Sequence, residues 1–187
     1  MSSAAAPVER QVARPNGWWG MAVFVAAEAT LFGTLVGTYV YLRLGSAHWP
    51  PPGLEKPHVL VPSLLTLALV LTSVPMQAAW RARRAAPLAL AAAVQTAYLV
   101  WQTHDFVSLI HAGPPAHSAY ASIVVTMLGA DHLHVLVGLL LDAWLLLQFA
   151  RGLTDYAVVG LRASTFYWHA VNTITVVVLL VQLSPYL

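Results

Sequence analysis

Five long apolar segments dominate this 187-residue chain and restrict what it can fold into. The hydrocarbon core of a bilayer is about 30 Å thick, so a helix needs about 20 apolar residues to cross it. Lipid offers the backbone no hydrogen-bonding partners, which leaves each segment helical. The sequence therefore predicts an all-α integral membrane bundle of five transmembrane helices. The predicted spans are residues 17–42, 59–79, 86–102, 119–149 and 164–183.

The composition supports one membrane domain. Charged residues make up only 9% of the chain, against about a quarter in an ordinary soluble domain. We expect residues 1–16 to form a polar cytoplasmic tail and residues 17–187 to form a single domain. The chain has no cysteine, which excludes thiolate metal sites, iron–sulfur clusters and disulfides. The few basic residues do not form a patch typical of nucleic-acid binding.

The basic residues predict how the chain is oriented. By the positive-inside rule, the side richer in Lys and Arg faces the cytoplasm. One side of the predicted bundle has Arg10, Arg14, Arg81, Arg83, Arg84, Arg151 and Arg162, whereas the other has Arg43 and Lys56. This places the N-terminus in the cytoplasm and the C-terminus in the periplasm. The third loop, residues 103–118, then lies outside with His104, His111 and His117, which we interpret as solvated.

Ionisable residues within the spans are the main candidates for a site, because a charge in mid-membrane costs about 2.5–3.5 kcal/mol. Glu28 lies about 16 Å into the first span. In the fourth span, Asp131, His134 and Asp142 share one helical face, so they should point together into the bundle. His132 is rotated away from His134, so "DHLH" does not predict a metal site.

In the fifth span, "FYWHAVN" places Trp168, His169 and Asn172 within little more than one turn. Asn172 and Asp142 each lie about 12 Å from the cytoplasmic end of their helices, so we expect a hydrogen bond between them. Two other functions remain open on the residues alone. His134 and His169 invite a b-type haem, although their depths of about 24 Å and about 8 Å do not suit one iron. A small transporter is the other alternative.

Four motifs, in order, resemble the subunit III family of the haem–copper (cytochrome c) oxidases in its five-helix bacterial form. They are "WWGMAVFVAAEATLFGTLVGTYVYLR" around Glu28, "WQTHDF" with Gln102 and Asp105, "YASIVVTMLGADHLHVLVG" with His134 and Gly138, and "FYWHAVN" with Tyr167, Trp168 and His169. The chain departs from the family pattern at Asp131, where His is usual, at Asn172, where Asp is usual, and at Leu65, where Asn is usual.

The resemblance implies a non-catalytic subunit of a proton-pumping terminal oxidase in a bacterial inner membrane. Such a subunit binds no haem or copper itself. It stabilises subunit I, which carries both, and works beside subunit II and the others in aerobic respiration. The family also binds structural phospholipid and supports proton uptake. A related accessory subunit of a nitric oxide reductase is the alternative within this resemblance.

Within the family, Glu28 corresponds to a buried glutamate and a possible proton or lipid-cleft site. We expect Glu28 to pair with a polar group of the fourth span, with His134 as the first candidate. Their depths differ by more than one turn, so a tilt must bring them together.

Overall fold

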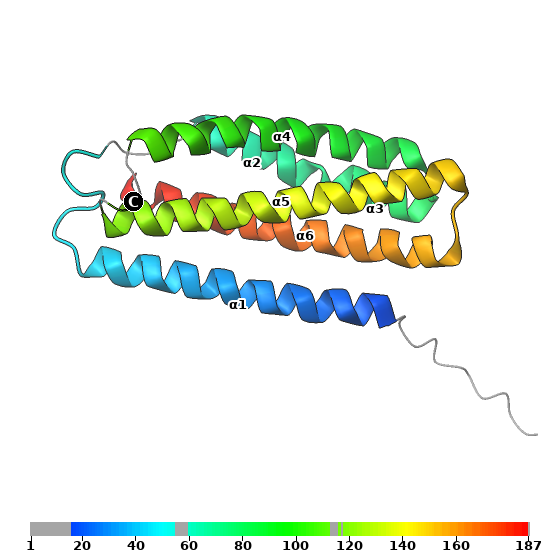
Figure 1. Cartoon of the computed structure of the whole chain (residues 1–187), viewed down its shortest axis with the longest axis horizontal. Helices are drawn as coiled ribbons and strands as arrows, with labels where there is room; N and C mark the ends of the chain where they lie inside the picture. The colour runs from blue at the N-terminus through cyan, green and yellow to red at the C-terminus, as the bar shows by residue number, and fades with distance from the viewer. Residues whose placement is uncertain (1–15, 55–59, 113–115, 117, 187) are drawn as a thin grey trace, which may run out of the picture.

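The computed structural model describes residues 16–54, 60–112, 116 and 118–186 (Figure 1). Within these ranges the protein is all helical, with its long helices running roughly along one common direction. The elements are α1 (Asn16–Leu44), α2 (Leu60–Leu71), α3 (Ser73–Ala82), α4 (Ala85–Ala112), α5 (Ala119–Arg151), α6 (Asp155–Leu183) and the short 3-10 helix η2 (Ser184–Tyr186). The all-α prediction is confirmed for these residues.

Four helical stretches of the described chain are long and apolar enough to cross a membrane. They are α1, α5, α6 and the combined stretch Leu60–Ala82, which contains α2 and α3. Helix α4 has 28 residues but is not among the four. The bundle thus has the predicted helical segments, whereas five membrane crossings and the orientation of the ends stay predictions.

The second predicted span is broken at Thr72. Pro75 has no backbone N–H, so the carbonyl of Leu71 loses its usual partner four residues on. At the break the Thr72 backbone N–H donates to Leu69 O at 3.0 Å, and the Thr72 hydroxyl donates to the same oxygen at 2.6 Å. These bonds satisfy polar groups that a break would otherwise expose.

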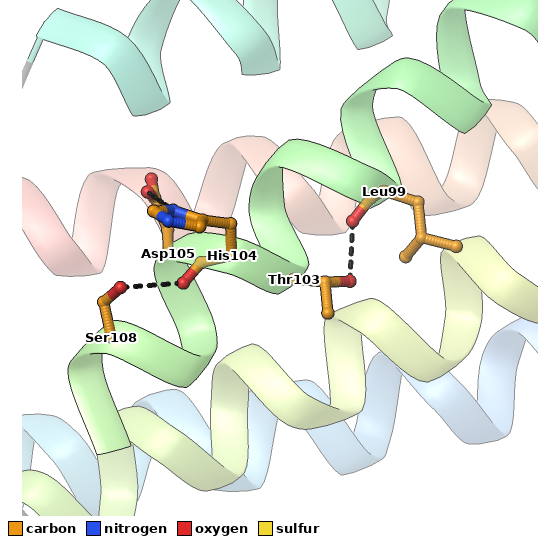
Figure 2. Close-up of polar contacts among 5 residues, drawn as sticks. All are labelled: Leu99, Thr103, His104, Asp105 and Ser108. Carbon is orange, nitrogen blue, oxygen red and sulfur yellow. Dashed lines mark hydrogen bonds and ion pairs between the residues drawn. The ribbon is translucent and has the colours of Figure 1, made fainter. Parts of the chain in front are cut away.

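Two helices extend further than their hydropathy predicted. Helix α4 ends at Ala112 rather than at residue 102, so His104 and His111 lie on a helix and not in a loop. Figure 2 shows this extension, in which the hydroxyls of Thr103 and Ser108 donate to Leu99 O and His104 O, at 2.7 and 3.0 Å, within α4 itself. His117 lies outside the described residues.

Helix α6 begins at Asp155 rather than at residue 164. The Thr154 side chain caps it by accepting a bond from the backbone N–H of Ala157 at 3.2 Å. Arg162 is therefore helical and not part of a loop. Its Cζ lies 5.9 Å from the ring centroid of Trp18 and 5.7 Å from that of Trp80, so it links α6 to α1 and α3.

Helices α5 and α6 form the centre of the bundle, and α1 lies along one side of them (Figure 1). Helix α1 buries only Phe32 and Tyr39. Helices α5 and α6 are packed tightly at Gly138, where an added Cβ would lie 2.6 Å from the indole of Trp168. The fully buried Trp168 therefore requires glycine at this position.

We predict that Gly138→Ala lowers the stability of the bundle by about 1–3 kcal/mol, the usual cost of overpacking. Gly33→Ala is the matched control, because Gly33 is also helical but has nothing within 4 Å of an added Cβ. Thermal unfolding of the purified variants in detergent measures both changes. Equal midpoints for the two variants would contradict the packing described at Gly138.

Candidate functional site

Glu28 of α1 and His134 of α5 meet in the structure. His134 Nε2 lies 2.9 Å from Glu28 Oε2, and the two side chains are only 10% and 19% exposed. This distance is within hydrogen-bonding range. The contact expected between Glu28 and His134 is therefore confirmed. The ring of Phe32, one turn after Glu28, packs edge-on against the His134 ring at 5.3 Å and covers the contact.

The other ring nitrogen of His134 is also held in place. His134 Nδ1 lies 2.6 Å from the carbonyl oxygen of Ala130. A carbonyl oxygen only accepts, so Nδ1 carries a hydrogen and Nε2 is left to face Glu28. The two contacts hold the imidazole ring between the α5 backbone and α1.

Asp131 is the second polar residue of the α5 face, and it is 1% exposed. Its Oδ1 accepts a bond from Thr175 Oγ1 of α6 at 2.8 Å, and its Oδ2 accepts a longer one from Tyr98 of α4 at 3.4 Å. Asp131 therefore joins three helices through neutral donors.

Asp142 lies about three turns further along α5 and is fully buried. Its Oδ1 accepts a bond from Ser164 Oγ of α6 at 2.9 Å. Its Oδ2 lies 3.0 Å from the side-chain amide of Gln95 on α4, which donates to it when the amide nitrogen faces that way. Asp142 thus repeats the arrangement at Asp131, with one partner on α4 and one on α6.

The prediction of a hydrogen bond between Asn172 and Asp142 is wrong. Asn172 Nδ2 donates instead to Ser73 Oγ of α3 at 2.8 Å. His169, one turn earlier on α6, places Nε2 3.5 Å from Gln77 Oε1, also on α3. Similar depth did not bring Asn172 to Asp142, because its side chain is rotated toward α3.

The structure separates the two histidines of the haem alternative. His134 faces α1 and His169 faces α3, so their ring nitrogens have different partners. Across residues 16–54, 60–112, 116 and 118–186, no three His, Asp or Glu side chains gather where they could hold a metal ion. His132 points elsewhere, with its ring 5.0 Å from that of Phe106.

Several residues that complete the site were not identified from the sequence. The partners of the two aspartates are Gln95, Tyr98, Ser164 and Thr175, and the partner of Asn172 is Ser73. Their signal in the sequence is a polar side chain within an otherwise apolar helix. The sequence shows Gln95 and Ser164 as polar residues in apolar segments. It does not show which neighbouring helix their side chains face.

No known family profile matches the chain. Individual proteins named as oxidase subunit 3 match most of it. A cytochrome c oxidase subunit 3 from Thermostichus vulcanus is 26% identical over 84% of this chain and 82% of its own length. Another from Synechocystis sp. is 29% identical, covering 85% of this chain and 71% of its own. A quinol oxidase subunit 3 from Bacillus subtilis is 27% identical, covering 90% and 87%. These relatives support the resemblance of the chain to the subunit III family of the haem–copper oxidases.

The Glu28–His134 contact joins two of the four motifs that carry the resemblance. The two departures in the site have partners of their own. Asp131 is bound by Thr175 and Tyr98, and Asn172 donates to Ser73. Both replacements are therefore accommodated by hydroxyl groups on neighbouring helices.

We predict that Glu28→Leu destabilises this subunit by about 1–3 kcal/mol, because it leaves His134 Nε2 buried without a partner. Glu28→Gln keeps a donor that can reach Nε2 and should cost less than about 1 kcal/mol. Unfolding midpoints of the two variants compare these costs. Equal losses would show instead that the contact requires a charged pair.

Proposed function

We propose that this chain is the non-catalytic subunit III of a proton-pumping haem–copper terminal oxidase in a bacterial inner membrane. The observation that carries the proposal is the similarity to proteins named subunit 3 of cytochrome c oxidases and of quinol oxidases, over 84–90% of the chain. These names favour an oxidase over a nitric oxide reductase. In this role the chain takes part in aerobic respiration without performing the redox chemistry.

The partners proposed are subunit I, which would hold the haem and copper, together with subunit II and the remaining subunits. Helix α1 supports a role in packing against such partners. Its inner side contributes Phe32 and Tyr39 to the core, while its outer side exposes Val23, Leu31 and Tyr41. An apolar outer face of this kind can meet either lipid or another transmembrane helix. We place the five helices across the membrane with the N-terminus in the cytoplasm.

Glu28 and His134 are proposed as the functional group of the subunit. His134 Nδ1 is bound to Ala130 O and Nε2 lies 2.9 Å from Glu28 Oε2, so two ionisable groups are held side by side. Glu28 remains 19% exposed at the side of the bundle that α1 forms. Both features suit a proton-holding site beside a structural phospholipid. Asp131, Asp142, Trp168, His169 and Asn172 are proposed to fasten α5 and α6 to their neighbours behind this pair.

Purification through an affinity tag on this chain tests the proposed function. We expect a haem- and copper-containing protein to co-purify, and the complex to reduce oxygen with either reduced cytochrome c or a quinol as electron donor. A control preparation with the tag on an unrelated membrane protein sets the background.

Two results would contradict the proposal. Haem in a one-to-one ratio with this chain alone would indicate a b-type cytochrome. Recovery of a pigment-free oligomer of this chain would favour a transporter.

A further inference from the structure

The surroundings of Asp142 contain neutral donors and a route to the surface. Among the described residues that pack around the carboxyl are Gln95 of α4, Ser164 and Trp168 of α6, and none of them is charged. Arg162, two residues before Ser164 on α6, is held instead between Trp18 and Trp80. Neutral partners are compatible with either protonation state of Asp142, whereas a cation would hold it ionised.

A pocket of about 190 Å³ opens beside α5 and α6 and ends at Ser164, the hydroxyl partner of this carboxyl. Its outer part is lined by Gly17 and by Tyr156, which is 77% exposed and is the titratable residue of the lining. Its inner lining includes Ser164, which is only 2% exposed. The Ser164 hydroxyl donates to Asp142 Oδ1 at 2.9 Å, so one side chain separates the pocket from the carboxyl.

The Gln95 amide can face Asp142 in two ways, and each way suits one protonation state. With its nitrogen toward Asp142, Gln95 donates to Oδ2 at 3.0 Å and to Ala91 O at 3.2 Å, which stabilises an ionised carboxylate. With its oxygen toward Asp142, the same 3.0 Å separation needs a proton on Oδ2 that donates to Gln95.

The far end of the amide reaches the break between α2 and α3. When the Gln95 oxygen faces Asp142, its nitrogen donates to Thr72 Oγ1 at 3.3 Å, and the Thr72 hydroxyl keeps its bond to Leu69 O at 2.6 Å. When the amide is reversed, its oxygen competes with Leu69 O for the single hydroxyl proton of Thr72. The protonation state of Asp142 therefore alters a hydrogen bond that stabilises the break.

We propose that Asp142 binds and releases a proton through this pocket, and that the Gln95 amide reverses with each change. The ligand is a proton delivered by water in the pocket: hydronium protonates Oδ2, water is left behind, and the reverse step returns the proton. This site lies about two turns along α5 from His134, has its own partners on α4 and α6, and does not rest on the oxidase assignment.

Infrared spectroscopy of the purified complex, labelled with ¹³C at the aspartate carboxyls, tests the proposal between about pH 5 and about pH 10. We expect the carboxylic acid band of Asp142 to be exchanged for its carboxylate band over this range, and the change to be absent in Asp142→Asn. Asp131→Asn is the matched control and should retain the change. The side-chain amide signal of Gln95 in ¹⁵N-labelled protein should move with the same midpoint.

The pocket is tested by removing one hydroxyl at a time. Ser164→Ala should slow hydrogen–deuterium exchange at Asp142 about tenfold, the effect of losing about one hydrogen bond. Thr175→Ala, which removes the matching donor of Asp131, should leave exchange at Asp142 unchanged. An Asp142 band that stays constant across the pH range in the unmodified complex, or a Gln95 signal that does not move, would overturn the proposal. Both of these outcomes are measured on the labelled wild-type complex, so the test does not depend on the folding of any variant.

Discussion

The bundle depends on the hydrogen bonds that the polar face of α5 makes with its neighbours. Asp131, His134 and Asp142 all point into the protein, where an unpaired polar group would be costly. Each of them has a partner on another helix: Glu28 on α1, and a pair of residues from α4 and α6 for each aspartate. These contacts fix the rotation of every helix that touches α5, which apolar packing against lipid alone would not do.

Much of this architecture could be predicted from the sequence. Apolar length alone identified the helical segments, and helical periodicity correctly placed Asp131, His134 and Asp142 on one buried face. The contact between Glu28 and His134 was also predicted, although the depth estimate left a gap of more than one turn. The observed ends of α1 and α5 differ from the predicted ends by no more than two residues, so the placement of the two helices relative to each other, and not their ends, closes this gap.

Other features could not be read from hydropathy. The start of α6 is marked by the Thr154 cap rather than by the apolar boundary, and α4 continues past its apolar part through the polar stretch drawn in Figure 2. The pairing of Asn172 with Ser73 depends on side-chain rotation, which depth does not define. The break at Thr72 could not be predicted without knowing how the helix accommodates Pro75. In each case a polar group found a partner that the one-dimensional pattern does not contain.

An experimental structure of the purified complex gives the most direct test, because one density map shows both the neighbours of this chain and the contacts of α5. We predict that Glu28 lies within about 3.2 Å of His134 Nε2, and that this chain packs against a haem-containing subunit. A separation of more than about 4 Å with no bridging water, in a complex where α5 meets α1 through apolar residues alone, would contradict the account.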